Sequence, residues 1–435
     1  MPPRFPPKSA KKKGKAKEPV LETYDDFFDE AVLQEEKGER WKVSDGPKAG
    51  RFLARALELY DQCLRLRPND FDTTYNVARI HFLLTQLPPT PPTEQLIAGL
   101  QRAIESHKAA LTLSPENIDA LFNTAQVSIE LVETVTEADD GRGGQVVPVL
   151  EEAIQLLQRC YQVQEQELRN TAAEEATEPT ANGDDMDTDI PIALSAGEEL
   201  NEEDDEGETE RATVKYATTP STLLDTCLAM LHAYTVYLSI IASAPPSASS
   251  TADAATTVQN ITTSANEDLI LRKAALLAQQ SEREPELALA RANLLSTAAA
   301  ASVAHGLATL TDWQAALSHY ERTNPKDAEA LCDRADALIA YARATSPFGA
   351  PAEAQQQAWT VYTQAAGLLG AAVKLATFTQ PTPLEVWITR AEVDLARARL
   401  DTEVSRRNRG VLFQNARVFY KNAGRGDLGD AIVEV

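Results

Sequence analysis

The chain is poor in the residues that build disulfides, metal sites and β-sheets. Its 435 residues include four cysteines, which lie far apart without a paired spacing. Aromatic residues make up only 6% of the sequence, whereas a β-sandwich favours aromatic and β-branched residues. We therefore expect reduced cysteines packed in a core, and an all-α fold in which abundant alanine allows close contact between helices.

Sequence signatures of catalysis and cofactor binding are also missing. The five histidines stand in no His-x-x-x-His context, and no Cys-x-x-Cys occurs, so we expect no metal site. No Gly-x-Gly-x-x-Gly or phosphate-loop pattern occurs either, which removes the usual support for a nucleotide cofactor. The sequence predicts a protein that is not an enzyme and that uses no cofactor and no small-molecule substrate.

Long apolar segments are a further absence. No uninterrupted apolar run reaches the roughly 18–20 residues that span a bilayer. The first residues are rich in proline and lysine and lack the apolar core of a signal peptide. We expect no membrane partner and a location in the cytoplasm, the nucleus or both.

Negative charge is concentrated in one segment, residues 174–210, which we name the acidic arm. The formal net charge of the chain is −24, and the acidic arm holds sixteen Asp or Glu without any Lys or Arg, so only −8 remains for the other residues. Its densest part is Glu202, Glu203, Asp204, Asp205 and Glu206. The arm has too few apolar residues to fold, and a flexible polyanion attracts basic proteins over long distances. The alternative is a solvating insert without a partner.

The first seventeen residues are basic instead. Their lysine cluster resembles a nuclear import signal and consists of Lys11, Lys12, Lys13, Lys15 and Lys17. The alternative is that this tail pairs with the acidic arm of the same chain. We expect the tail to be disordered, because it has nothing to bury.

A sequence pattern is repeated at 67–78, 114–125 and 324–335. The shared frame is x-Pro-x-(Asn/Asp)-x-(Asp/Glu)-x-x-bulky-(Asn/Asp)-x-Ala. Each proline follows a stretch with helical periodicity, and an Asp or Asn two residues later is placed to cap the next helix. These pairs are Pro68 with Asp70, Pro115 with Asn117, and Pro325 with Asp327. The repeat predicts stacked units of helix, proline turn and helix.

These units resemble the tetratricopeptide repeat (TPR) family. The family places small, bulky and small residues before the proline and a small residue ten positions after it. The matching residues are Ala56, Tyr60, Cys63 and Ala78, then Ala103, His107, Ala110 and Ala125, and Ala335 in the third unit. The prolines are spaced more widely than the family's 34 residues, so the resemblance is to a divergent member with lengthened inter-helix loops. It implies an all-α, TPR-like solenoid of about six or seven helix pairs, interrupted by a disordered acidic insert.

The resemblance also implies a ligand groove on the first helix of each pair. Its positions correspond here to Asp72, Tyr75, Asn76, Arg79, Asp119, Phe122, Asn123, Gln126, Glu329, Asp333 and Asp336. Amide side chains offer both a donor and an acceptor to an extended peptide backbone. The alternative for Asn76 and Asn123 is that they hold neighbouring helices in register.

The charge of these positions predicts the charge of the ligand. The family's clamp for the acidic tail of a heat-shock chaperone needs Lys and Arg where this chain has Asp72, Asp119, Glu329 and Asp333. Carboxylates repel an acidic tail, so we expect a basic protein partner. We do not expect direct nucleic-acid binding, since the chain as a whole repels phosphates.

The expected organisation follows from these segments. The predicted parts are a disordered basic tail at 1–22, TPR-like repeats at 23–170, a disordered acidic insert at 171–214, TPR-like repeats with a basic capping helix at 215–425, and a tail at 426–435. A low-complexity stretch over 242–257 predicts a linker or long loop.

The predicted function is non-catalytic binding of a basic client, such as a ribosomal protein or a histone, by an escort or assembly chaperone. Two alternatives are a scaffold subunit of a multiprotein complex and an adaptor that docks on the chaperones Hsp90 or Hsp70.

Overall fold

The computed structural model describes residues 21–138, 145–177, 218–244, 250–347, 349–375 and 384–432. These residues form helices and no strand. Their contacts divide the chain into two compact units, 1–142 and 143–435, which are described separately below. The all-α fold of successive packed helices agrees with the sequence prediction.

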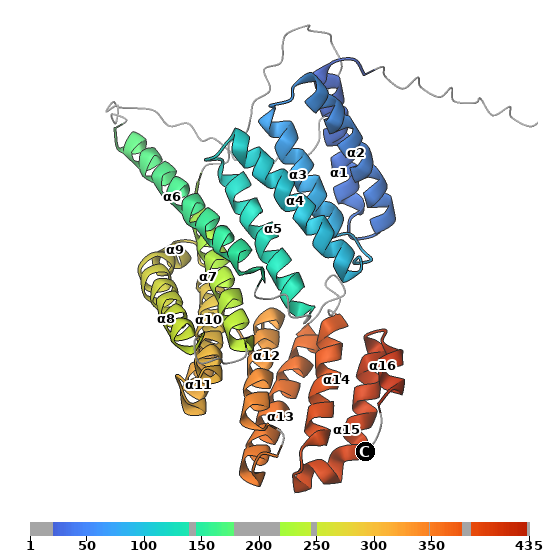
Figure 1. The fold of residues 1–435 in the computed structure, drawn as a ribbon, viewed down its shortest axis with the longest axis vertical. Coiled ribbons are helices and arrows are strands. Elements are labelled where there is room, and N and C mark those ends of the chain that lie inside the picture. Colours follow the sequence, from blue (N-terminus) through green and yellow to red (C-terminus); the bar gives the residue numbers. More distant parts are fainter. Residues whose placement is uncertain are drawn as a thin grey trace, which may run out of the picture. The chain divides into compact units, whose positions relative to one another are not determined.

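The first unit is a row of five helices in which each helix packs on the next (Figure 1). They are α1 (Tyr24–Trp41), α2 (Gly46–Leu66), α3 (Phe71–Thr85), α4 (Thr93–Leu113) and α5 (Ile118–Glu137). Asp70 caps α3 by accepting from the backbone N–H of Thr73, and Asn117 caps α5 by accepting from that of Ala120. Both predicted caps are therefore confirmed, and each starts a helix directly after a repeat proline.

The second unit contains the remaining helices. Its longest are α6 (Val147–Thr177), α7 (Pro220–Ser243), α10 (Glu284–Ala304), α12 (Ala328–Thr345), α13 (Ala352–Leu375), α14 (Leu384–Arg399) and α15 (Glu403–Asn422). Shorter ones are α8 (Ser250–Thr262), α9 (Ala275–Gln280), α11 (Leu310–Leu317), α16 (Gly426–Asp430), a π-helix over Thr263–Ala274 and a 3₁₀-helix over Ser318–Arg322. Asp327 caps α12 as predicted, by accepting from the backbone N–H of Glu329.

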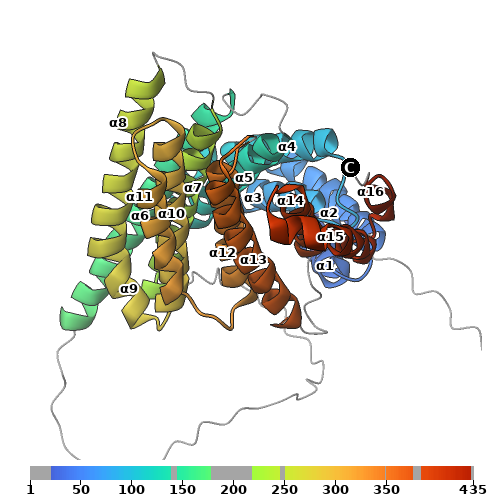
Figure 2. The same cartoon turned by 90° about the horizontal axis from the view of Figure 1, so that it is seen from below.

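Helix α10 lies at the centre of the packing in the second unit. It packs against α7 and α12, as can be followed in Figures 1 and 2, and it also contacts α8, α9, α11 and both irregular helices. A core around Trp313, Tyr320 and Tyr341 joins α11 and α12, and the ring of Trp313 meets that of Tyr341 edge-on at 5.5 Å. This core sets the rotation of α12 about its own axis, and with it the direction in which the repeat's acidic residues point.

Several boundaries differ from those expected. Helix α8 begins at Ser250, inside the stretch predicted to be a linker, because Val258 and Ile261 supply a buried stripe. Helix α6 reaches Thr177, inside the predicted acidic insert, and packs on α7 in the second unit. Helix α16 lies in the predicted C-terminal tail, where Leu428 packs onto a core formed with α15.

Two helices of the described part of the chain are long and apolar enough to cross a membrane. Neither is an uninterrupted apolar run, so the sequence did not predict them. They are α7 and α10, with mean hydropathy of 1.4 and 1.3. In these windows 50% and 33% of the residues are buried, and the two helices pack against each other. Core helices of globular proteins pass the same test of length and composition.

Candidate functional site

The predicted groove residues all lie on the helices that follow a repeat proline. Helix α3 carries Asp72, Tyr75, Asn76 and Arg79; α5 carries Asp119, Phe122, Asn123 and Gln126; and α12 carries Glu329, Asp333 and Asp336. The first two helices belong to the first unit and α12 belongs to the second. The two groups have different chemistry.

In the first unit the asparagine side chains bond within the chain. Asn76 donates from Nδ2 to the hydroxyl of Tyr60 at 3.2 Å, and Asn123 donates from Nδ2 to the hydroxyl of Tyr75 at 2.5 Å. These bonds join α3 to α2 and α5 to α3. In both asparagines an amide N–H therefore bonds a neighbouring helix and not a peptide ligand. These contacts are those expected if Asn76 and Asn123 hold neighbouring helices in register.

Arg79 is also engaged within the first unit. Its guanidinium lies 3.1 Å from Glu35 Oε1 and 3.3 Å from Glu39 Oε1, both on α1. Glu35 is only 5% exposed, and Oε2 of the same side chain accepts a hydrogen bond from the Tyr60 hydroxyl at 3.0 Å. Burial raises the pKa of Glu35, while the positive charge of Arg79 opposes this rise. The ion pairs of this network join α3 to α1, so Arg79 serves to hold the helices of the unit together.

Four other predicted residues of the first unit lie on α3 and α5. Asp72 and Asp119 are exposed, whereas Phe122 and Gln126 are half-buried. Burial and the nearby Asp70 raise the pKa of Asp72. These four residues stay a predicted contact surface.

The second unit has an open cavity of about 310 Å³ beside a helix that the repeat pattern assigned to the groove. We name it the acidic groove. Apolar residues from α7 and α10 form part of its wall, and the polar lining includes two of the predicted residues. The lining residues are Leu228, His232, Thr235, Glu286, Leu289, Ala290, Asn293, Asp327, Glu329 and Asp333.

Helix α12 carries three neighbouring carboxylates, of which Glu329 and Asp333 line this groove. Glu329, Asp333 and Asp336 are spaced by four and three residues, so they share a helix face and repel one another. Burial raises the pKa of each, and Asp333 raises those of both neighbours further. The pKa of Asp336 reaches about 6, although the residue is exposed, because protein atoms crowd its carboxylate on one side.

Asn293 of α10 holds one of these acids in place. It donates from Nδ2 to Asp333 Oδ2 at 2.6 Å and accepts from the Tyr320 hydroxyl at 2.6 Å. The buried tyrosine therefore orients the asparagine, which in turn orients the carboxylate.

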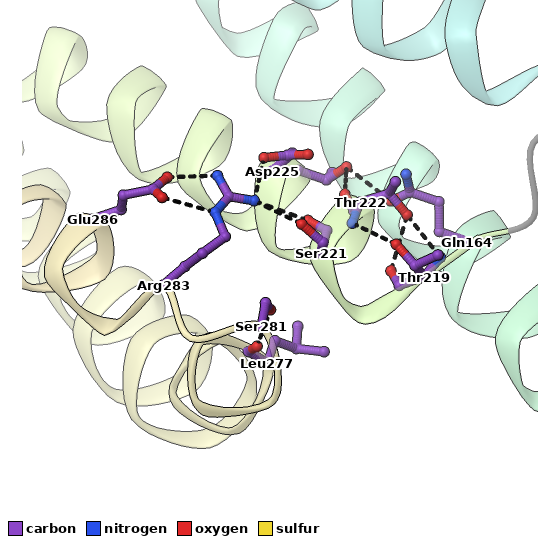
Figure 3. A network of polar contacts seen from close by, with 10 residues as sticks. Gln164, Thr219, Ser221, Thr222, Asp225, Leu277, Ser281, Arg283 and Glu286 are labelled. Atoms are coloured by element: carbon purple, nitrogen blue, oxygen red, sulfur yellow. Dashed lines mark hydrogen bonds and ion pairs between the residues drawn. The ribbon is translucent and has the colours of Figure 1, made fainter. Parts of the chain in front are cut away.

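Arg283 binds Glu286, a residue of the groove lining, and Figure 3 shows the contacts of this arginine. Its Nε lies 2.9 Å from Glu286 Oε1 and one terminal nitrogen lies 2.5 Å from Oε2, which is a two-pronged ion pair. The other terminal nitrogen donates to Asp225 Oδ1 at 2.7 Å and to Ser221 Oγ at 3.0 Å. The guanidinium thus bridges α7 to the first turn of α10, and a carboxylate of the groove lining already binds an arginine in this way.

Other predicted features are located as follows. Cys63, Cys160 and Cys227 are reduced and buried as predicted, whereas the reduced Cys332 is only half-buried in α12, where burial and the neighbouring acids raise its pKa to about 11. The lysine cluster of the tail and the dense part of the acidic arm lie outside the described residues. Within the described residues, no group of three or more His, Cys, Asp or Glu has a geometry that would hold a metal ion.

The chain has only limited similarity to known proteins. No protein-family model matches the chain. UPF0656 protein C926.02 of Schizosaccharomyces pombe (strain 972) is 42% identical over 66 residues, which are 15% of this chain and 15% of that protein. The matched segment therefore spans well under two thirds of this relative.

Two solved structures align over most of the chain. Yeast Tom70 aligns over 92% of this chain and 96% of its own, with 10% identity and a TM-score of 0.17. Naa15/Naa10 bound to HypK-THB aligns over 92% of this chain and 66% of its own, with 13% identity and a TM-score of 0.13. Because these scores are low, the helical-repeat description rests on the helices, caps and packing of the chain itself.

Proposed function

We propose that this chain is a divergent tetratricopeptide repeat protein that binds a basic segment of another protein in the acidic groove. It acts as an escort or assembly chaperone for a client such as a ribosomal protein or a histone, in the cytoplasm or the nucleus, and has no catalytic role. The observation that carries the proposal is the crowding of carboxylates on α12, where Glu329 and Asp333 line a cavity and Asp333 raises the pKa of both Glu329 and Asp336.

A long basic side chain matches this cavity in two ways. Leu228, Leu289 and Ala290 provide apolar contact for the methylene stem of a lysine or arginine, while the carboxylates attract its charged head. Burial and mutual repulsion raise the carboxyl pKa values, and a ligand cation lowers them, so binding is coupled to proton release. Two arginines of the unit, Arg283 and Arg343, already form ion pairs with Glu286 and Glu392 respectively.

The acidic arm supports the same function. A segment of sixteen carboxylates draws a polycation towards the protein and shields its charge during transfer. The groove and the arm carry charge of one sign, which favours a basic client over an acidic chaperone tail. A permanent scaffold role would use the same groove, but it would not require the arm.

The test is a titration of the full chain with a peptide rich in arginine and lysine. The variant E329Q/D333N removes two charges of the groove lining with little change of shape. We expect about tenfold weaker binding, since each partly exposed charge contributes roughly 0.7 kcal/mol to a close ion pair. Unchanged affinity would contradict the proposal.

The matched control is E105Q/E353Q. These exposed glutamates lie on α4 and α13, and the variant changes the net charge by the same amount. Affinity that falls equally in the control and the groove variant would show that only total charge matters, and would exclude the groove as the site.

The role of the acidic arm needs a separate variant. Deleting residues 178–210, which leaves α6 whole, should weaken binding of the same peptide, most strongly at low salt, and leave helical circular dichroism intact. Binding that does not change would reduce the arm to a spacer. An acidic chaperone-tail peptide should not bind, and micromolar binding of that peptide would favour the adaptor alternative.

A further inference from the structure

Helix α15 has one face that packs on its neighbours. The residues of this face are Ser405, Leu412, Phe413, Ala416 and Tyr420, all of them buried. The helix contacts α14 and α16, and these buried residues account for its place in the fold. Another face of the helix is exposed.

Three valines on that other face are exposed. Val404, Val411 and Val418 expose 40%, 62% and 48% of their surface. They recur every seven residues, so they form a stripe along the whole helix. A single exposed valine is ordinary on a protein surface, but a stripe of constant spacing is an unpartnered apolar face.

Asparagines complete a regular seam between these valines. Asn408, Asn415 and Asn422 each follow a valine by four residues, and the first two precede the next valine by three. The alternation of four and three is the spacing of the contact positions of a coiled coil, with valine at d and asparagine at a. Asparagine at position a fixes the register of a pair of helices and lowers its stability. We name these six residues the α15 seam.

The charge around the seam is positive. Helix α15 contains five cations and a single acidic residue, Glu403, in a chain whose net charge is −24. The cations are Arg406, Arg407, Arg409, Arg417 and Lys421. Arg407 pairs with Glu403, but both side chains are more than three quarters exposed, so this pair contributes little. A second copy of α15 laid along the seam would bring cations against cations.

We propose that the α15 seam docks an acidic amphipathic helix of another protein. Apolar residues of that helix would cover the valines, and its flanking carboxylates would meet Arg407 and Lys421 at the g positions of the seam. The valines and asparagines supply the register, and the charge selects an acidic helix over a second copy. This surface is independent of the acidic groove, since it takes a partner of opposite charge.

The probe is a synthetic peptide of about three heptads with leucine at a and d and glutamate at e and g. Fluorescence anisotropy with the full chain should show saturable binding of this peptide. The variant V404S/V411S/V418S should weaken it at least about tenfold, while V43S, at a valine that is 91% exposed in the turn after α1, should leave it unchanged. Equal binding by the triple variant would overturn the proposal.

A charge reversal provides a second test that leaves the valines in place. R407E/K421E should lose the glutamate peptide and gain a peptide with lysine at e and g. Equal binding of both peptides by the unmodified chain would also overturn the proposal. So would concentration-dependent self-association that the serine variant abolishes, because it would make a second copy the occupant. Neither test depends on binding in the acidic groove.

Discussion

The ion pair between Arg79 and Glu35 provides the sharpest stability prediction. Substituting Arg79 by Met keeps much of the side chain's length but leaves Glu35 buried without its counter-charge, since the Glu35 side chain is only 7% exposed. Removing the partner of a buried charged group costs roughly 1–3 kcal/mol or more, and the 39% exposure of Arg79 keeps this ion pair within that range. The exposed contact to Glu39 adds little. We expect the first unit to lose about 2 kcal/mol.

The sign of the pH dependence follows from the carboxyl. Burial already raises the pKa of Glu35, and loss of Arg79 removes the interaction that opposes the rise. A carboxyl with a raised pKa in the folded state destabilises the fold when the pH is above that pKa. The loss of unfolding free energy caused by R79M should therefore reach its full size when the pH is above the raised pKa of Glu35. It should disappear as the pH falls from that value to the ordinary pKa of a glutamate.

Amide hydrogen exchange of peptides from α1 and α3 is the suitable assay, because it reads the stability of this unit inside the full chain. A loss of about 2 kcal/mol corresponds to roughly 30-fold faster exchange. The double variant E35Q/R79M should recover most of the loss, since a neutral glutamine side chain at that position needs no counter-charge. R55M is the matched control, because Arg55 and Glu58 form a pair with side chains that are 56% and 66% exposed. A change below about threefold in R79M, or no recovery in the double variant, would refute the assigned role of this pair.

Three further outcomes are expected. N76L should lower the stability of the first unit by about 1 kcal/mol in the same exchange assay, because the hydrogen bond to Tyr60 is lost. It should leave the affinity for a basic peptide unchanged, and a loss of affinity without a loss of stability would restore the ligand-binding role of Asn76. R283Q should bind a basic peptide several-fold more tightly in a titration, since it frees Glu286 for the ligand; weaker binding by a folded variant would contradict this. Affinity for a basic peptide should fall as the pH drops from about 7 to about 5, because protonation of Asp336, whose pKa is about 6, removes an attracting charge. In D336N the affinity should depend less on pH over this range.

Local features of the repeats could be predicted from the sequence. The caps Asp70, Asn117 and Asp327 follow from a proline and an Asx residue two positions apart, which is short-range chemistry. The shared face of Glu329 and Asp333 follows from helical spacing alone. These predictions needed only the repeat pattern.

Contacts between distant helices could not be predicted in this way. Glu35 precedes the first repeated frame, and nothing near it in the sequence indicates that Arg79 is its partner. Arg283 follows a turn after α9 in which Glu282 has a φ of 57°. The contact of Arg283 with Asp225 on α7 depends on this turn, which the sequence does not reveal. The α15 seam is visible as spacing, but only the burial of another face of the helix shows that the seam is exposed.

The most direct test of the central claim is a hydrogen-exchange footprint of the full chain with and without an arginine- and lysine-rich peptide. We predict slower exchange in the first turns of α10 and α12, around Glu286 and Glu329, and no change in α13. Protection confined to α3 and α5, or protection that persists undiminished in E329Q/D333N, would contradict binding of a basic segment in the acidic groove.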